Sequence, residues 1–250
     1  MMTALRLPAD GVSAAKARVD QAGEIHDAIL TRLSHELRTP LNSVIGFSRV
    51  LQGNRSGNQR PADLAMLEAI RSNGERLLGL VEDLMALSVQ PPVVETSPPP
   101  LVCVADIAAD VVGKWQAAAR CKGIILALEV EAQGAIHIDP TSLATLLAKL
   151  VCNAVKFTDC GDVVVTVTCR DGWDEPGSVV VTDSGIGIAA DRLRAVFEPF
   201  VQAEDSMCRH YEGAGLGLPI ARAMASGMGC ALVVRSELGA GTRIEVEFPE

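Results

Sequence analysis

A histidine with an acidic and a hydroxyl neighbour lies in a helix-forming part of the chain. Residues 34–41 read SHELRTPL, so Glu36 follows His35 directly and Thr39 lies one helical turn further on. His35 is two positions from a leucine on either side, a rotation of about 200° at the helical period, so it faces away from the apolar stripe. A substantial fraction of an exposed imidazole is neutral near pH 7, and its free ring nitrogen is a competent nucleophile toward a phosphoryl group.

Glu36 and Thr39 can support that chemistry. The carboxylate of Glu36 can accept the other ring N–H of His35, which orients the ring and removes the proton as a phosphoramidate forms. The hydroxyl of Thr39, on the same helix face as His35, can position a water molecule for hydrolysis of a phosphorylated partner. The pattern by itself also fits a solvated surface histidine without a chemical role.

Two further motifs are suited to a nucleotide. NAVKFT, at residues 153–158, ends an expected helix, and the amide oxygen of Asn153 is a suitable ligand for a Mg²⁺ ion that also binds phosphate oxygens. Lys156 can neutralise the same phosphates. DSGIGI, at residues 183–188, follows an expected strand. Asp183 can accept a hydrogen bond from an adenine amino group, while Gly185 and Gly187 let the backbone approach the base.

A third motif, GAGLGL at residues 213–218, opens an expected helix. The free N–H groups and the dipole at a helix N-terminus favour an anion. The motif fits the dinucleotide-binding fingerprint poorly, because it does not follow a strand. Between it and DSGIGI lie FEPF, at residues 197–200, and a polar stretch at residues 202–212. That stretch is long enough to be a lid over the ligand, and it also fits an ordinary surface loop.

The elements expected around His35 form a helical hairpin. Apolar residues recur at three- and four-residue steps over residues 14–51 and again over residues 61–90, with a turn at 53–61. Pro61 is well placed to open the second helix. One hairpin cannot bury both apolar stripes alone, whereas two copies form a four-helix bundle. We therefore expect a homodimer.

The chain changes character after the hairpin. Residues 90–100 hold five prolines in eleven positions, which favours an extended connector. Beyond it, helical and strand patterns alternate, and we expect an α+β sandwich of one sheet covered by helices, with consecutive strands joined as hairpins. The expected helices are 106–122, 140–157 and 216–228, and the expected strands are 125–131, 136–139, 163–169, 178–182, 231–235 and 243–248. The predicted domains are a lead-in (1–18), the hairpin (19–90), a linker (91–101) and the second domain (102–250).

Composition excludes several classes of function. The 250 residues include 22 Lys and Arg against 31 Asp and Glu, a net charge of −9, which argues against a sequence-independent grip on nucleic acid. The seven cysteines are an odd number without a C-x-x-C pair, so we expect neither disulfides nor zinc and infer a reducing compartment. No run approaches the roughly 18 apolar residues of a membrane span. We expect a cytoplasmic location and no membrane contact by this chain.

HELRTPL, NAVKFT, DSGIGI, FEPF and GAGLGL occur in this order along the chain. Together they resemble the transmitter core of bacterial sensor histidine kinases over about residues 20–250. The resemblance implies a HisKA-type dimerisation and phosphoacceptor hairpin, followed by a Bergerat-type α/β sandwich that binds ATP and Mg²⁺. The activity it implies is ATP-dependent autophosphorylation of a histidine and transfer of the phosphoryl group to an Asp of a response regulator receiver domain, together with phosphatase activity.

The resemblance also assigns roles to residues of this chain. His35 would be the phosphoacceptor, Glu36 its acid/base partner and Thr39 the phosphatase-associated position. Asn153 would bind Mg²⁺ and Asp183 the adenine. The implied nucleotide-binding set is Asn153, Lys156, Phe157, Asp183, Gly185, Gly187, Ile188, Gly213, Gly215, Leu216, Gly217, Leu218 and Thr242.

Lys149 departs from the family pattern. Many relatives carry a second Asn one helical turn before the NA pair, and a lysine at that place cannot ligate a metal ion. Lys149 can instead contact phosphate directly, or it can weaken metal-dependent ATP binding. The alternative reading is therefore a catalytically weak or ATP-independent phosphotransfer or docking module. A Bergerat ATPase that hydrolyses ATP for conformational work would leave HELRTPL unexplained.

Overall fold

The computed structural model describes residues 3–7, 41–48, 50–51, 61–88, 99–170, 173–201 and 215–249. The chain divides into two compact units, residues 14–89 and residues 1–13 together with 90–250, and each is described by itself. Within the described ranges, no helix has the length and apolar character needed to cross a membrane.

The smaller unit is helical wherever it is described. Residues 41–48 and 50–51 are helical, and α2 spans Pro61–Ser88, which confirms a second helix opened by Pro61. Most of the first predicted helix, including its start, lies outside the described residues. Several large apolar side chains of this unit are exposed, namely Leu41, Ile45, Val50, Leu67, Leu78 and Val81. The apolar stripe predicted from the sequence is therefore not covered within one copy of the chain.

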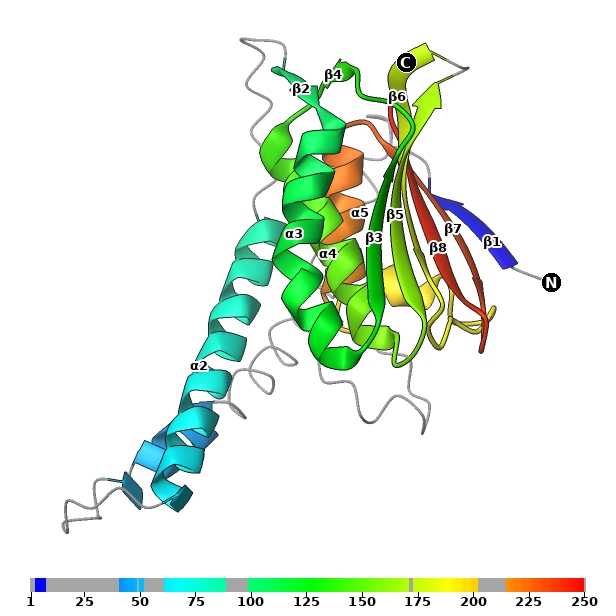
Figure 1. The fold of residues 1–250 in the computed structure, drawn as a ribbon. Helices are drawn as coiled ribbons and strands as arrows, with labels where there is room; N and C mark the ends of the chain where they lie inside the picture. Colours follow the sequence, from blue (N-terminus) through cyan, green and yellow to red (C-terminus); the bar gives the residue numbers. More distant parts are fainter. Residues whose placement is uncertain are drawn as a thin grey trace, which may run out of the picture. The chain divides into compact units, whose positions relative to one another are not determined.

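The larger unit is a twisted sheet covered on one face by three helices (Figure 1). Its six strands lie in the order β1-β7-β8-β6-β5-β3. Their bounds are β1 Thr3–Leu7, β3 Ile125–Val130, β5 Asp162–Arg170, β6 Trp173–Asp183, β7 Ala231–Glu237 and β8 Gly241–Glu247. The helices are α3 Val104–Lys122, α4 Pro140–Phe157 and α5 Gly217–Gly227. A helical region followed by a mixed α/β sheet confirms the predicted fold class.

Two expectations about the sheet are wrong. Among the described strands only β5–β6 and β7–β8 join as hairpins, whereas β3 pairs in parallel with β5. A parallel pair needs a long crossover, and the chain supplies it through β4 (Ala135–His137) and α4. The strand predicted at 136–139 is also not part of the main sheet, because β4 pairs with β2 (Leu101–Cys103) in a separate two-stranded ribbon.

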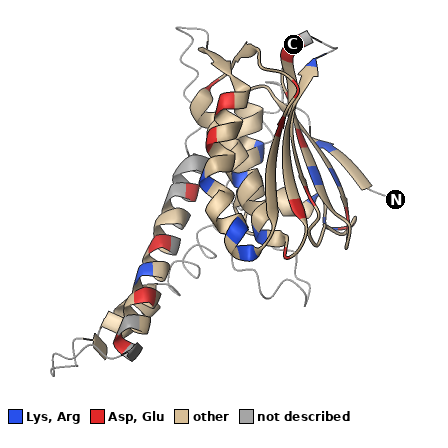
Figure 2. Cartoon of the chain, viewed as in Figure 1, with Lys and Arg blue, Asp and Glu red and all other residues tan. Residues whose placement is uncertain are grey.

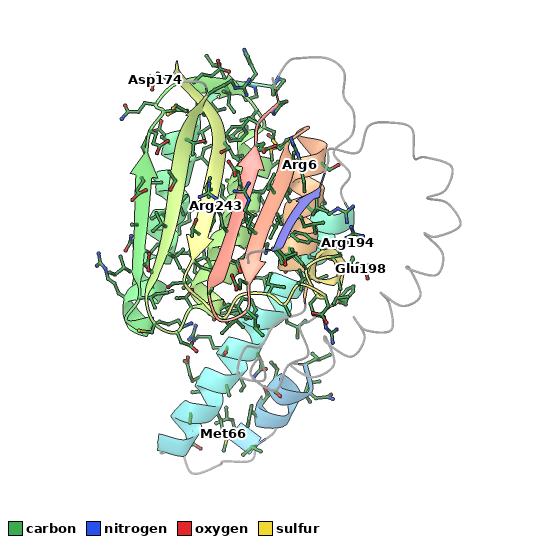
Figure 3. All side chains as sticks on the ribbon, turned by 90° about the vertical axis from the view of Figure 1, so that its right-hand side faces the viewer. Arg6, Met66, Asp174, Arg194, Glu198 and Arg243 are labelled. Carbon is green, nitrogen blue, oxygen red and sulfur yellow. The ribbon has the colours of Figure 1, made fainter. Side chains whose placement is uncertain are left out.

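Residues 1–18, expected to be a lead-in, contain an edge strand of the main sheet. All five residues of β1 pair antiparallel with β7, from Thr3 opposite Ser236 to Leu7 opposite Leu232. Arg6 reaches across β7 and donates to Glu247 of β8 at 2.6 Å (Figure 3). The N-terminal residues therefore belong to the larger unit, although the helical unit separates them from it in the sequence.

Helix α4 forms the centre of the core because its start and its apolar spacing agree. Asp139 caps the helix by accepting the N–H of Ser142 at 2.8 Å, and Pro140 occupies the first turn. One face buries Leu143, Leu146, Leu147, Leu150, Val151, Ala154 and Val155. These side chains pack on inward-facing valines of the sheet, Val163, Val165, Val167, Val179 and Val181. The cap at its start and the packing of its apolar face on the sheet fix the position of α4, and therefore the position of its last turn, which carries residues predicted to bind a nucleotide.

Positive side chains collect where the helices end. Arg120 and Lys122 lie in the last turn of α3 and Lys156 in the last turn of α4, and Figure 2 shows this end of the helices in blue. The Nζ of Lys122 donates to the carbonyl oxygens of Val155 and Lys156 at 2.9 and 2.8 Å. A cation at a helix C-terminus is favourable, so Lys122 holds the last turn of α4 in place.

Candidate functional site

Asp183 ends β6, and one of its two carboxylate oxygens is held by backbone. Its Oδ1 accepts the N–H of Gly185 at 2.9 Å and the N–H of Thr242 at 3.2 Å. Thr242 lies opposite Asp183 in the register between β6 and β8, which explains the second bond. No other described residue donates to the carboxylate, so Oδ2 keeps its capacity to accept a hydrogen bond from a ligand.

Burial dominates the electrostatics of this carboxylate. It raises the pKa of Asp183 from 3.8 to about 6, although the N–H groups of Gly185 and Thr242 act in the opposite direction. At pH 7 and above Asp183 is still mainly ionised. A partly buried, ionised carboxylate with one free oxygen is suited to recognise a hydrogen-bond donor such as an exocyclic amino group.

Three glycines around Asp183 lie where backbone segments approach too closely for any side chain. A Cβ on Gly185 would lie 2.5 Å from the carbonyl oxygen of Phe157, at the end of α4. Gly187 has φ +67° and its Cβ would lie 2.0 Å from the carbonyl oxygen of Glu237, while a Cβ on Gly241 would come equally close to the carbonyl oxygen of Asp183. The glycines therefore join three segments around one carboxylate, namely the end of α4, residues 183–188 and the β7–β8 hairpin.

A buried serine that the sequence analysis did not single out also joins these segments. The Oγ of Ser236, on β7, accepts the N–H of Ile188 at 2.7 Å and lies 2.9 Å from the Oγ1 of Thr242. It donates to the carbonyl oxygen of Gly241 at 3.0 Å. A signal for it exists in the sequence, because Ser236 is a polar residue at an inward position of an otherwise apolar alternating strand.

A second part of the site joins Asn153 of α4 to the start of α5. A Cβ on Gly217 would lie 3.0 Å from the Nδ2 and 3.2 Å from the Oδ1 of Asn153, so the amide of Asn153 lies directly against the helix N-terminus. The preceding residue, Leu216, makes no side-chain cap on this helix. Backbone N–H groups and an amide thus meet at one place, which suits an anion and a metal ion bound to it.

The segments on either side of residues 202–214 meet in the described structure. The N–H of Phe200 donates to the carbonyl oxygen of Gly215 at 3.2 Å. Both residues are left-handed, with φ of 64° at Phe200 and 69° at Gly215. A Cβ on Gly215 would lie 2.7 Å from the carbonyl oxygen of Val201, which explains the glycine at this position. A left-handed phenylalanine costs about 1–2 kcal/mol, and its burial offsets that cost.

The structure thus brings many of the predicted site residues into two groups. Asp183, Gly185, Gly187, Ile188, Thr242 and the backbone of Phe157 form the first group. Asn153 and Gly217, with Gly215, Leu216 and Leu218 beside Gly217 in the chain, form the second. Lys156 lies over the ring of Phe157, 4.7 Å from its centroid. The side chain of Leu216 is 1% exposed, so we expect only its backbone to face a ligand.

Four of the predicted site residues, His35, Glu36, Thr39 and Gly213, lie outside the described residues.

The described residues contain no cluster of three or more His, Cys, Asp and Glu side chains that could hold a metal by themselves. Asn153 is nevertheless a neutral oxygen donor directly against a helix N-terminus. Mg²⁺ in nucleotide sites is typically bound by one or two protein groups together with substrate phosphates. The residues present therefore fit a Mg²⁺ ion that arrives with a nucleotide.

Two family models match the chain. Residues 26–89 match the His Kinase A (phospho-acceptor) domain, and residues 138–250 match the family described as histidine kinase-, DNA gyrase B-, and HSP90-like ATPase. The first match contains His35, and the second contains both groups of site residues. The fold and the site thus define a transmitter core, in which a phosphoacceptor domain precedes an ATPase domain.

Individual proteins give the same result. An uncharacterized sensor-like histidine kinase of Rhizobium meliloti is 36% identical over 252 residues, which cover 98% of this chain and 46% of that protein. The histidine protein kinase DivJ of Caulobacter vibrioides is 33% identical and matches over 98% of this chain and 39% of its own length. The chain therefore spans less than half the length of these relatives.

Solved structures agree with the fold. Full-length ShkA in complex with AMPPNP superposes with a TM-score of 0.63 at 33% identity, covering 89% of this chain and 45% of ShkA. The histidine kinase AdeS of Acinetobacter baumannii has a TM-score of 0.62 at 21% identity, covering 86% of this chain and 98% of AdeS, and supports the fold alone. The chain belongs to the sensor histidine kinases, of which it carries the HisKA and HATPase domains.

Proposed function

We propose that this chain binds ATP with Mg²⁺, phosphorylates His35 and passes the phosphoryl group to an Asp of a response regulator. The observation that carries the proposal is the pairing of two complementary sites in the ATPase domain. One is a carboxylate with a free oxygen at Asp183, and the other is an amide against a helix N-terminus at Asn153 and Gly217. A nucleotide offers the matching groups, a hydrogen-bond donor on the base and a chain of anionic phosphates.

The adenine would be recognised at the Asp183 end. Oδ2 of Asp183 would accept a hydrogen from the amino group of the base, since Oδ1 already accepts two backbone N–H groups. Gly185, Gly187 and Ile188 would lie along the base, and Thr242 beside it. Phe157 supports this loop because its carbonyl oxygen accepts the N–H of Ile186 at 3.2 Å.

The phosphates would lie at the start of α5. Backbone N–H groups over residues 213–218 would donate to phosphate oxygens, and Lys156 would neutralise part of their charge. Asn153 would hold Mg²⁺, which when bound neutralises charge that develops on the transferred phosphoryl group. The role of these chain groups is to position the nucleotide and exclude wrong orientations.

The phosphoryl transfer itself needs a nucleophile and a base. A ring nitrogen of His35 would form the bond to the γ-phosphorus as the bond from that phosphorus to the β,γ-bridging oxygen breaks, so that ADP leaves. Glu36 would accept the proton from the other ring nitrogen. The phosphoryl group would then pass to a carboxylate oxygen of the receiver domain, and Thr39 would position a water molecule that hydrolyses the phosphorylated regulator.

A homodimer is part of the proposal. Leu41, Ile45, Leu67, Leu78 and Val81 are exposed in a single copy of the helical unit, although apolar residues at such spacing normally face a core. A second copy of the same hairpin would cover them and complete a four-helix bundle.

The test is incubation of the purified chain with Mg²⁺ and γ-labelled ATP, beside a His35→Ala variant. We expect label that is acid-labile and alkali-stable, as a phosphoramidate is, and no label in His35→Ala. The variant should bind ATP normally. Label retained in His35→Ala, or label stable to acid, would contradict the assignment of His35.

The same experiment decides the alternative of a phosphotransfer module that does not use ATP. Lys149 favours that alternative, because it lies one turn before Asn153 on α4 in place of a metal-binding amide. A module of this kind would take no label from ATP but would take label from a phosphorylated receiver domain. Labelling from ATP would make Lys149 a tolerated variation.

A further inference from the structure

Ser236 connects three backbone segments at the base-binding end of the site. It is 1% exposed, and its single hydroxyl oxygen makes hydrogen bonds to the N–H of Ile188, the carbonyl oxygen of Gly241 and the hydroxyl of Thr242. Ile188 belongs to the loop after Asp183, while Gly241 and Thr242 belong to β8. These bonds fill the normal capacity of a serine hydroxyl, which is one donated and two accepted hydrogen bonds.

The partners of Ser236 determine where its proton lies. The N–H of Ile188 can only donate, so Ser236 accepts there, and the carbonyl of Gly241 can only accept, so Ser236 donates its one hydrogen there. No hydrogen of Ser236 remains for Thr242. The 2.9 Å contact between the two hydroxyls therefore uses the hydrogen of Thr242, which donates to Ser236.

We infer that Ser236 is a positioning residue that leaves Thr242 able only to accept hydrogen bonds from a bound base, and so makes the site selective for a 6-amino purine over a 6-oxo purine. The inference rests on the proposed function and concerns the base that the same site takes. The geometry gives two acceptors at one strand end, Oδ2 of Asp183 and Oγ1 of Thr242, whose residues face each other across β6 and β8. A 6-amino group has two hydrogens to donate, whereas a 6-oxo group has none.

Removal of the Ser236 hydroxyl changes whether the hydroxyl of Thr242 donates or accepts a hydrogen bond at the ligand. In Ser236→Ala the hydroxyl of Thr242 loses its acceptor and can rotate to donate to a ligand. A 6-oxo purine then gains a donor that the wild type does not offer, while the 6-amino purine loses the ordered acceptor. The two nucleotides therefore respond differently, which a merely structural role of Ser236 would not produce.

The test is the ratio of the dissociation constants of ITP and ATP, measured by competition with a fluorescent nucleotide on the full chain. We expect the wild type to prefer ATP and Ser236→Ala to lower this preference about three- to tenfold, the range that one hydrogen bond provides. The matched control is Ser178→Ala. Ser178 is 4% exposed and also bonds two side chains, Thr168 and Glu245, but lies in the middle of the sheet away from the site. This control should lower stability and leave the ratio unchanged.

The outcomes separate this inference from the proposed function. Failure of the wild type to bind ATP would contradict the proposed function. A wild type that prefers ATP, together with an unchanged ratio in Ser236→Ala, would contradict only the role of Ser236, and so would an equal loss of both affinities. If Ser236→Ala does not fold, Ser236→Cys supplies a weaker hydrogen-bond acceptor for the Thr242 hydroxyl in a side chain of similar shape, and an unchanged ratio in that variant would likewise overturn the inference.

Discussion

Asp183→Asn should make the ATP-free protein more stable while it weakens nucleotide binding. Asn retains an oxygen that can accept the N–H groups of Gly185 and Thr242, which Asp183 accepts at 2.9 and 3.2 Å. It places an NH₂ group where the free carboxylate oxygen was, so it offers the adenine amino group a donor instead of an acceptor. We expect ATP affinity to fall at least tenfold.

The gain in stability follows from the burial of the charge. Burial raises the pKa of Asp183 from 3.8 in the unfolded chain to about 6 in the folded protein, so the ionised form is less favourable in the folded state. Such a difference corresponds to a cost of at most about 3 kcal/mol, and we expect about 1–2 kcal/mol after the new amide NH₂ is also partly buried. The cost is complete above pH 6 and disappears as the pH falls from 6 toward 3.8. The advantage of Asn should therefore be greatest near pH 7.5 and small near pH 4.5.

Urea unfolding monitored by tryptophan fluorescence measures this effect in the full chain. Both tryptophans, Trp115 and Trp173, belong to the unit that contains Asp183, so the signal reports on the ATPase domain. A free energy of unfolding for Asp183→Asn that is lower than that of the wild type at pH 7.5 would refute the reasoning. An advantage that does not change between pH 7.5 and pH 4.5 would also refute it.

Three other predictions concern the same domain. ATP affinity should fall as the pH drops from 7.5 to 5.5, because the proton goes to the free oxygen of Asp183 and turns it into a donor. Titration calorimetry should show this fall in the wild type, and an affinity that does not change between pH 7.5 and pH 5.5 would count against it. Gly187→Ala should cost more than about 2 kcal/mol of stability and abolish ATP binding, since the backbone of residue 187 has φ +67° and an added Cβ would lie 2.0 Å from the carbonyl oxygen of Glu237. An unfolding temperature of the variant near that of the wild type would contradict this close approach. Lys122→Met should cost about 1–2 kcal/mol by urea unfolding, because two carbonyl oxygens at the end of α4 lose a charged donor, and an unchanged midpoint would refute the capping role.

Much of the ATPase domain could be predicted because its local signals agree. The bounds predicted for α4, residues 140–157, are those of the structure, since Asp139 provides a cap, Pro140 the first turn and the leucines one continuous apolar face. The strands β5 and β6 follow from alternating valines, although both are longer than predicted. Within such elements the residue types alone are enough to predict the type of element and its approximate bounds.

Long-range pairing could not be predicted in the same way. No local pattern predicted β1, whose sequence is TALRL, and its partner β7 lies more than 200 residues further along the chain. The parallel pairing of β3 with β5 depends on how α4 packs, which no local pattern encodes. The predicted domain boundaries at residues 18, 90 and 101 stay predictions.

In the candidate site, too, the features that depend on one short segment could be predicted, and the features that depend on long-range contacts could not. Asp183 and the glycines after it belong to one short motif, so their residue types alone led to the prediction of a base-binding loop, whose geometry the structure describes. For Ser236 the sequence signals only a polar residue at an inward strand position, since its role comes from contacts with Ile188 and Gly241 that form only in the folded protein. The glycine motif at residues 213–218 predicted an anion site, but the contact of Gly217 with Asn153 needed the structure.

The most direct test of the central claim is to locate the phosphoryl group. The full chain would be incubated with ATP and MgCl₂, digested at neutral or alkaline pH and analysed by tandem mass spectrometry, beside Asp183→Asn under the same conditions. We predict a phosphoryl group on His35 in the wild type and a much smaller phosphorylated fraction in Asp183→Asn at an ATP concentration near the dissociation constant of the wild type. A folded wild type that binds ATP but carries the phosphoryl group on another residue, or carries none, would contradict the proposed kinase mechanism.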